Sequence, residues 1–171
     1  MVDRLEKSGF FNSSGGDRVY SATDFAAYFG KLVSNGIFYA SATNLQVTPG
    51  NGMAINVAAG SAWINGYSYE NTDTFELNLA TASGVNPRID RVVVRFSAVE
   101  RRIHLSVLTG TPAEIPAAPV LTRSNDTYEL GIADIMIPKG SVTVTAINIT
   151  DMRLNTALCG LANSLVTAVY E

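Results

Sequence analysis

Few residues in this sequence are able to do acid–base or nucleophilic chemistry. Its one histidine, His104, stands between Ile103 and Leu105 in a stretch where apolar and polar residues alternate. This pattern favours a strand residue that faces solvent. A Ser-His-Asp triad would have to use this histidine, and the sequence contains no Gly-x-Ser-x-Gly nucleophile motif. We therefore predict no catalytic residue and expect the protein not to be an enzyme.

Metal-binding patterns are equally sparse. One histidine and one cysteine, Cys159, cannot form a tetrahedral zinc site without several carboxylates, and no Cys-x-x-Cys or His-x-x-x-His spacing occurs. The segments 71–73 and 125–126 offer Asn and Asp oxygens of the kind that calcium binds. Neither matches the EF-hand pattern, and Asn and Asp are common turn formers. We predict no metal and no cofactor.

Charged residues leave two further possibilities open. Any two acids that meet in space would suit a glycosidase, so a cell-wall hydrolase is one alternative. The richest basic group lies on two neighbouring predicted strands, where it suits either an acidic partner such as teichoic acid or a strand face offset by Asp90 and Glu100. The second interpretation is favoured, because no stacking aromatics are interleaved with these residues, which are Arg88, Arg91, Arg95, Arg101 and Arg102.

Aromatic residues in the middle of the chain suggest another kind of site. Trp63, Tyr67 and Tyr69 flank an Asn-Gly turn signal at 65–66. On one exposed face they would form a platform for sugars, so a carbohydrate-binding module that contacts cell-wall glycans is an alternative function. Burial of Trp63 would remove the best residue of such a platform.

The composition limits the classes to which the protein can belong. The chain has 171 residues, 47% of them hydrophobic and 16% charged, which predicts one folded domain over 1–171. A net charge of −3 provides no general attraction to nucleic acid or anionic lipid. The first residues lack the apolar core of a signal peptide, and no apolar run is long enough for membrane insertion. We expect a protein made in the cytoplasm that binds no nucleic acid and enters no membrane.

The N-terminal region predicts an arm followed by one helix. Residues 1–20 are rich in Gly, Asn and Ser, which is typical of a flexible arm that either frays or lies on a neighbouring subunit. A helix is predicted over 21–35, with Ser21 as N-cap and Asp24 three residues later. Phe25, Phe29, Leu32 and Val33 recur at helical spacing. We expect this stripe to dock on a sheet and the helix to end at the Asn-Gly pair 35–36.

Residues 44–153 predict an antiparallel β-sandwich. Short runs of alternating apolar residues are separated by Gly, Pro and Asn, and no second helix lies between them. In the central hairpin, Ile89, Val93 and Ile103 are expected to face the core, and Arg91 and Arg95 to face solvent. Asp90, Asp134 and Asp151 stand beside apolar strand residues and are expected to pair with arginines such as Arg153.

The last segment, 154–171, is an apolar tail that suits either a helix or a strand. Its larger apolar residues predict a partner interface formed by Leu161, Leu165, Val166 and Val169.

The order of several segments resembles the shoulder, or N-terminal, domain of siphophage receptor-binding proteins. These segments are Phe-Ala-Ala-Tyr-Phe at 25–29, Asn-Gly at 35–36, Gly-x-Ala-x-Ile-x-Gly at 60–66, Arg-Ile-Asp-Arg-Val-Val-Val-Arg at 88–95, Tyr-Glu-Leu-Gly-Ile-Ala-Asp-Ile at 128–135 and Ile-Thr-Asp-Met-Arg at 149–153. The resemblance covers about residues 17 to 160. It is closest to small tail-tip and baseplate proteins of siphophages that infect Gram-positive bacteria such as Bacillus.

The resemblance implies a β-sandwich that carries the helix on one side and assembles as a trimer or a larger ring at the end of a phage tail. It implies no catalysis. The neck and head domains of the receptor-binding proteins have no counterpart in these 171 residues. We therefore expect a virion component that acts as an oligomeric structural adaptor, binds other tail and baseplate proteins, and makes at most indirect contact with the host wall.

Overall fold

The computed structural model describes residues 8–166. These residues form a mainly β structure with one α-helix at the N-terminal side. In chain order the elements are α1 (Ala22–Phe29), β1 (Gly36–Ile37), β2 (Val47–Pro49), β3 (Ala54–Val57), β4 (Gly60–Ile64), β5 (Tyr67–Asn71), β6 (Phe75–Asn78), β7 (Arg88–Ser97), β8 (Arg102–Leu108), β9 (Thr127–Ile137), the 3-10 turn η1 (Ala146–Asn148) and β10 (Ile149–Asp151).

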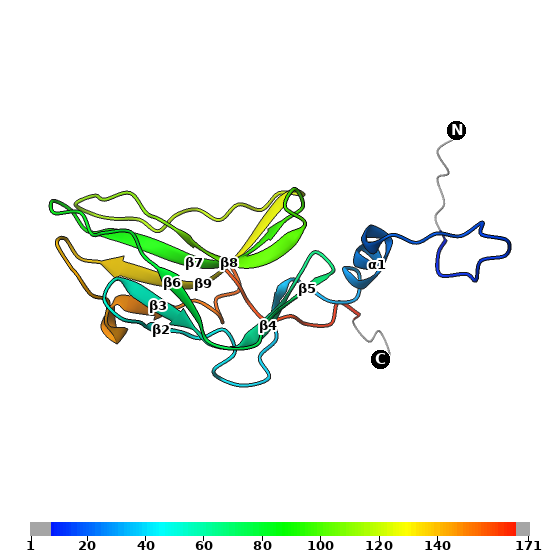
Figure 1. The fold of residues 1–171 in the computed structure, drawn as a ribbon, viewed down its shortest axis with the longest axis horizontal. Helices are drawn as coiled ribbons and strands as arrows, with labels where there is room; N and C mark the ends of the chain where they lie inside the picture. Colours follow the sequence, from blue (N-terminus) through cyan, green and yellow to red (C-terminus); the bar gives the residue numbers. More distant parts are fainter. Residues whose placement is uncertain (1–7, 167–171) are drawn as a thin grey trace, which may run out of the picture.

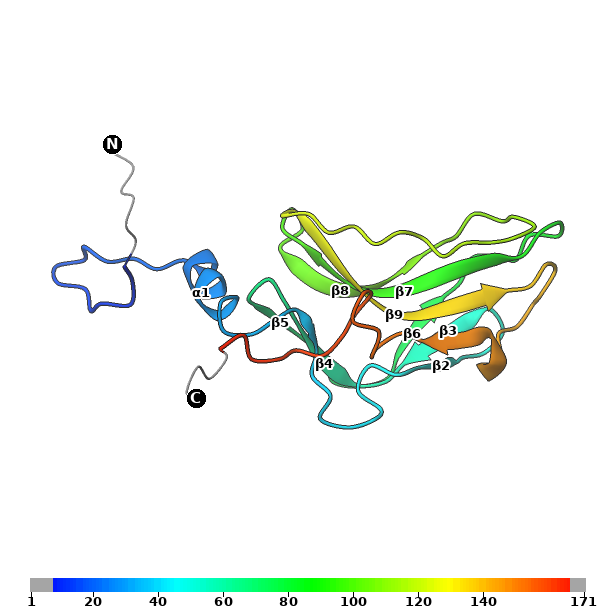
Figure 2. The ribbon, with the colours of Figure 1, turned by 180° about the vertical axis from the view of Figure 1, so that it is seen from behind.

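The strands form three antiparallel sheets with the orders β10-β9-β7-β8, β2-β3-β6 and β1-β4-β5. The four-stranded sheet lies across from β2-β3-β6, and β4 and β5 lie at the end of the body nearest to α1 (Figures 1 and 2). All three sheets contribute to one hydrophobic core, for which Ile55 of β3, Ile64 of β4 and Val94 of β7 are examples. The prediction of a mainly β protein with one helix is confirmed.

Strand β7 shows which face of the central hairpin meets the core. Val92, Val94 and Phe96 belong to the core cluster, so the even-numbered residues of β7 face inward. The prediction that Ile89 and Val93 face this core was wrong, because they share the opposite face with Arg91 and Arg95. Val93 is nevertheless fully buried. Arg91 on the same face donates to the carbonyl of Pro119, so the segment after β8 lies over this side of the sheet.

A β-bulge in β9 brings two acids onto one face of the sheet. Arg91 is paired with Asp134 and Arg95 with Glu129, although the two acids are five residues apart. Regular alternation would place residues at an odd spacing on opposite faces. The register shifts opposite Val92 and Val93, and the extra residue lets both acids meet their arginines.

Helix α1 is shorter than the predicted 21–35. Its start is confirmed, since the Ser21 side chain accepts from the Asp24 amide in a capping box. The helix ends at Phe29, because Val33 and Ser34 turn to pair with residues 163–164. Gly36 then enters β1, where its Cα lies so close to the Leu161 backbone that no side chain would fit.

The C-terminal segment is neither helix nor regular strand within its described part. Residues 160–166 run in extended form beside residues 32–37, with single bridges at Ile37–Leu161 and Val33–Ser164. This course returns the chain to the end of the molecule where α1 lies (Figure 1). The described C-terminal residues therefore lie at the same end of the molecule as the helix and the N-terminal arm.

Candidate partner interface

Helix α1 is only partly covered by the rest of the chain. Ala26 is its one buried residue, and it lies over Gly66 at the turn between β4 and β5. That turn is the predicted Asn-Gly pair, with φ of 52° at Asn65 and 83° at Gly66. The aromatic stripe was expected to dock on a sheet, but Phe25 and Tyr28 are 44% and 46% exposed. Ala26 makes this contact, whereas Phe25 and Tyr28 face away from the turn.

A continuous row of aromatic rings crosses this end of the molecule. The ring centroids lie 4.9 Å apart for Phe10 and Tyr28, 5.6 Å for Tyr28 and Phe29, 6.0 Å for Phe29 and Trp63, and 6.4 Å for Trp63 and Phe38. Phe25 joins the row through Phe10 at 5.2 Å. We call this surface the aromatic end; its members are Phe10, Phe25, Tyr28, Phe29, Phe38 and Trp63.

The N-terminal arm supplies one of these rings. Phe10 has a φ of 66°, which is uncommon for a residue with a bulky side chain. It stacks against Tyr20, Phe25 and Tyr28, and the Phe11 amide donates to the Tyr20 hydroxyl over 2.8 Å. Ring contacts worth roughly 0.5–1.5 kcal/mol each offset the backbone strain. Flexibility of residues 1–20 stays a prediction, and residues 1–7 lie outside the described part.

The predicted interface residues of the tail fall into three groups. Leu161 packs against the protein's own core. Leu165 and Val166 are 50% and 64% exposed, and the Leu165 amide donates to the Leu32 carbonyl just after α1. Val169 lies outside the described residues. Leu165 and Val166 are therefore exposed beside the segment that follows α1, and the interface predicted for them remains a prediction.

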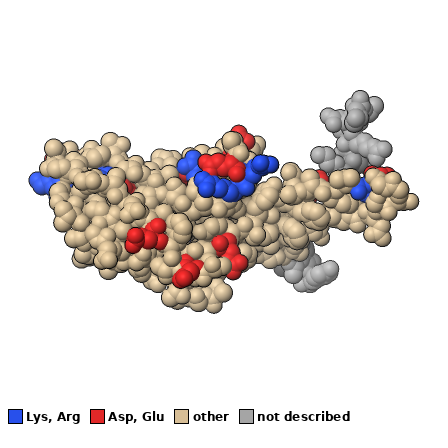
Figure 3. Space-filling model, in the orientation of Figure 1, with Lys and Arg blue, Asp and Glu red and all other residues tan. Residues whose placement is uncertain are grey.

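Charged side chains are sparse at this end. Between residues 19 and 39 the sequence has two charged residues, Asp24 and Lys31. The Asp24 carboxylate accepts from both the amide and the hydroxyl of Ser21, each over 2.8 Å. The surface over α1 shows few charged side chains on the face drawn in Figure 3, whereas Lys, Arg, Asp and Glu gather over the β body.

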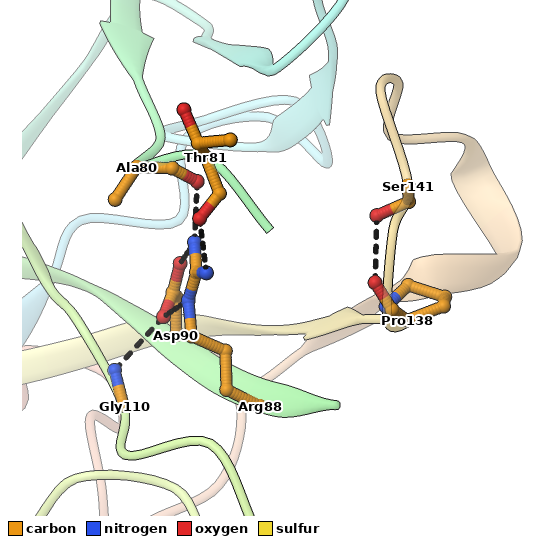
Figure 4. A network of polar contacts seen from close by, with 7 residues as sticks. All are labelled: Ala80, Thr81, Arg88, Asp90, Gly110, Pro138 and Ser141. Atoms are coloured by element: carbon orange, nitrogen blue, oxygen red, sulfur yellow. Dashed lines mark hydrogen bonds and ion pairs between the residues drawn. The ribbon is translucent and has the colours of Figure 1, made fainter. Parts of the chain in front are cut away.

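The arginine group of the central hairpin is mainly engaged within the fold. Arg88 pairs with Asp90 in the core, and Asp90 also accepts from the Gly110 amide (Figure 4). The other pairs are Arg91–Asp134 at 2.6 Å, Arg95–Glu129 at 3.4 Å and Arg102–Glu100 at 2.6 Å. Four of the five arginines thus have acidic partners, as expected for a strand face and not for a site that binds an acidic polymer.

Arg153 and Asp151 form the remaining predicted pair. The Arg153 guanidinium is almost fully buried and donates to Asp151 over 2.6 Å and to the carbonyls of Ala42 and Asn44. The hydrogen bond from Arg153 lowers the pKa of Asp151, against a smaller opposing effect of burial. The pair joins the segment after β10 to the loop before β2. The prediction that Asp90, Asp134 and Asp151 pair with arginines is confirmed.

His104 lies among these charges on the outer face of the sheet. It is paired in register with Arg95. Partial burial, and then the positive charge of Arg102, lower the pKa of its imidazole below the usual value. The Nδ1 atom is buried and has no hydrogen-bond partner among the described residues. Glu100 is close enough to raise the pKa of this imidazole against the two arginines, but it makes no hydrogen bond to Nδ1, the contact that orients the histidine of a triad.

The aromatic residues proposed as a sugar platform do not share a face. Trp63 is opposite Ser68 in the β4–β5 pair, whereas Tyr67 is opposite Ile64 and Tyr69 is opposite Ala62. Tyr67 and Tyr69 therefore lie on the core side, where Tyr67 stacks on Phe96 and burial raises the pKa of Tyr69 to about 12. Trp63 lies on the other side, half-buried between Phe29 and Phe38. The three rings cannot bind one sugar chain together.

One hollow lies between the start of α1 and the adjoining ends of β5, β7 and β8. Tyr67 and Phe96 form part of its lining, with Arg101 and Arg102 at one side. None of the described residues that line it is an aspartate or glutamate. Within residues 8–166 no three His, Cys, Asp or Glu side chains are grouped closely enough to hold a metal ion. Cys159 is buried, which raises the pKa of its thiol to about 12.

Comparison of the chain with protein-family models, with curated proteins and with solved structures found no match in any of the three. None of the helices formed by residues 8–166 has both the length and the apolar character needed to cross a bilayer.

The sequence pattern identified part of the aromatic end. The helical spacing pointed to Phe25 and Phe29, but the composition of the arm drew attention to its Gly, Asn and Ser residues. The adjacent Phe10 and Phe11 were the available signal, since two large apolar residues in a polar arm suggest a contact. Trp63 and Phe38 also belong to the row, but the pairing of β1 with β4 brings them together and is not visible in the sequence.

Proposed function

We propose that this protein is a non-enzymatic structural component of a siphophage tail tip or baseplate, where it acts as an oligomeric adaptor in the host adsorption apparatus. The observation that carries the proposal is the aromatic end: a nearly uncharged surface, built by the arm, α1 and β4, that the chain itself leaves half exposed. Large exposed apolar patches mark interaction sites.

The use of the charged residues also favours a structural role. Several carboxylates are paired with arginines and are not free to act in a glycosidase, as in Arg91–Asp134 and Arg95–Glu129. Such pairs stabilise the fold, because they fix the strand register and attach loops to the sheet.

The β body supports a sandwich of the shoulder-domain kind. The four-stranded sheet and β2-β3-β6 face each other across one core, and the helix lies to one side, as the resemblance over residues 17–160 implies. In this proposal the protein is made in the cytoplasm of a bacterial host and resides in the virion. Its partners are other tail and baseplate proteins and further copies of itself.

Capture of tail proteins tests the proposal. The tagged protein is incubated with a lysate of phage-infected host cells and with a matched uninfected lysate, and bound proteins are identified by mass spectrometry. We expect tail or baseplate proteins from the infected lysate alone. Their absence, or release of sugars when the pure protein is incubated with purified cell walls, would contradict the proposal.

A further inference from the structure

We infer that the aromatic end is the surface through which copies of this chain bind one another. The inference rests on the proposed function only in that the protein works in an assembly. Beyond the proposed function, the inference identifies the surface that makes the contact and the partner that binds there, which is a second copy of the chain.

The first ground is the incomplete packing of α1. The helix has eight residues, fewer than the roughly 12–15 that give an isolated helix marginal stability in water. Tertiary contacts must therefore stabilise it, and within its own chain Ala26 alone is buried. Phe25 and Tyr28 lie on the other side of the helix, where Phe10 covers them only in part and they stay 44% and 46% exposed. A second copy would bury these rings and complete the packing of the helix.

The second ground is the area available. An aromatic side chain buries roughly 200 Å² when fully enclosed. Five rings of the aromatic end are 38–46% exposed, and Leu165 and Val166, whose segment pairs with the residues that follow α1, are 50% and 64% exposed. Together these side chains present on the order of 600 Å², against about 800 Å² per partner in a standard protein–protein interface. The surface is thus large enough to supply most of an interface.

The third ground is charge, which selects the occupant. The region 19–39 carries one acid and one base, and the charged residues nearest to it in the arm, Asp17 and Arg18, pair with each other. Two identical copies can therefore meet without repulsion between like charges. A strongly charged partner would find few groups of opposite charge on this surface. Within the described part, the C-terminal segment does not block the approach of a second copy, because residues 160–166 pair with residues 32–37 of their own chain.

The test uses a reporter that the chain already contains. Trp63 is the one tryptophan of the sequence and lies in the middle of the aromatic row. Sedimentation equilibrium and Trp63 fluorescence are measured over a range of concentrations for the wild type, for Tyr28→Arg and for Ile147→Arg. The last is the matched control, because Ile147 is 94% exposed and lies in η1, outside the aromatic end.

We expect the wild type and Ile147→Arg to self-associate, with Trp63 emission moving to shorter wavelength as concentration rises. Tyr28→Arg should associate at least about tenfold more weakly, because burying an unpaired charge is unfavourable. Hydrogen exchange of the wild type, compared between dilute and concentrated samples, should show concentration-dependent protection of residues 22–29. This measurement requires no variant and therefore does not depend on the folding of Tyr28→Arg.

A wild type that stays monomeric, a folded Tyr28→Arg that associates like the wild type, or protection confined to other segments would each overturn the inference. Failure of the proposed function gives a different result. A self-associating protein that captures no tail protein would leave the inference standing. A monomer that captures tail proteins would refute the inference and the oligomeric part of the proposed function, and would leave the role in the phage tail standing.

Discussion

Arg88 and Asp90 form an ion pair on the core face of β7, two residues apart along the strand, with Arg88 Nε 2.9 Å from Asp90 Oδ1. Their side chains are 3% and 0% exposed. Arg88 also donates to the carbonyls of Ala80 and Thr81, and Asp90 accepts from Gly110, so the pair joins β7 to the segments after β6 and β8 (Figure 4). Buried charges of this kind are stable only when all their partners are in place.

Removing one charge of this pair should strongly destabilise the fold. Asp90→Asn keeps the shape of the side chain but leaves Arg88 buried without a counter-charge, and we expect a loss of about 3–5 kcal/mol in the free energy of unfolding. Urea denaturation of the variant and the wild type measures this loss in the free energy of unfolding. The control is Glu100→Gln, which breaks the exposed Arg102–Glu100 pair and should change stability little. Equal effects of the two substitutions would contradict the role given to burial.

Gly66→Ala should displace α1 from the β body. A Cβ at this position would overlap the Ala26 carbonyl, and Gly66 also has a φ of 83°. Gly140→Ala is the matched control, because Gly140 has a φ of 68° but has open space around it. We expect the control to lose about 1 kcal/mol from backbone strain and Gly66→Ala about 1–3 kcal/mol more. Trp63 emission should move to longer wavelength in Gly66→Ala alone, since Phe29 would leave the indole ring; an unchanged spectrum would contradict the packing described.

The Arg153–Asp151 pair should make stability depend on pH in the acid range. The pKa of Asp151 is lowered in the folded protein, so the pair stabilises the fold above the ordinary carboxyl pKa and loses this effect as pH falls through the lowered value. Because Asp151 is 51% exposed, we expect Asp151→Asn to cost only on the order of 1 kcal/mol at pH 7. The difference between variant and wild type should vanish in strong acid. Thermal unfolding at several pH values measures it, and a constant difference would be inconsistent with the pair.

Cys159 should be unreactive in the folded protein. Burial raises the pKa of its thiol to about 12, so almost no thiolate exists at pH 8. We expect a thiol reagent such as dithionitrobenzoate to label Cys159 slowly in native protein and rapidly in urea. Fast labelling without denaturant would show that the segment around 159 opens readily and does not belong to the core.

The strand content could be predicted from alternation and turn residues. Which face of β7 meets the core, and where α1 ends, could not be predicted in this way. Alternation in β7 is regular, but both of its faces are buried in part, so hydrophobicity alone does not say which side meets the core. The sequence also placed arginines on the expected outer face, yet Arg88 lies in the core because Asp90 is there to pair with it. The bulge in β9 leaves no mark in the spacing of apolar residues.

The end of α1 depends on contacts distant in sequence. The apolar spacing of Leu32 and Val33 continues the helical pattern, but their backbone pairs with the C-terminal segment, some 130 residues away. Similarly, the row from Phe10 to Phe38 is assembled from the arm, the helix, β4 and the residue that follows β1. Sequence could locate its members but not their adjacency.

The presence of the protein in the virion is the most direct test of the central claim that this chain is a structural part of a phage tail. Quantitative mass spectrometry of purified phage particles should find it at a fixed copy number relative to the other tail proteins, in a multiple that matches a trimer or a larger ring. Its absence from purified particles, while it is abundant in the infected cells that produced them, would contradict the account.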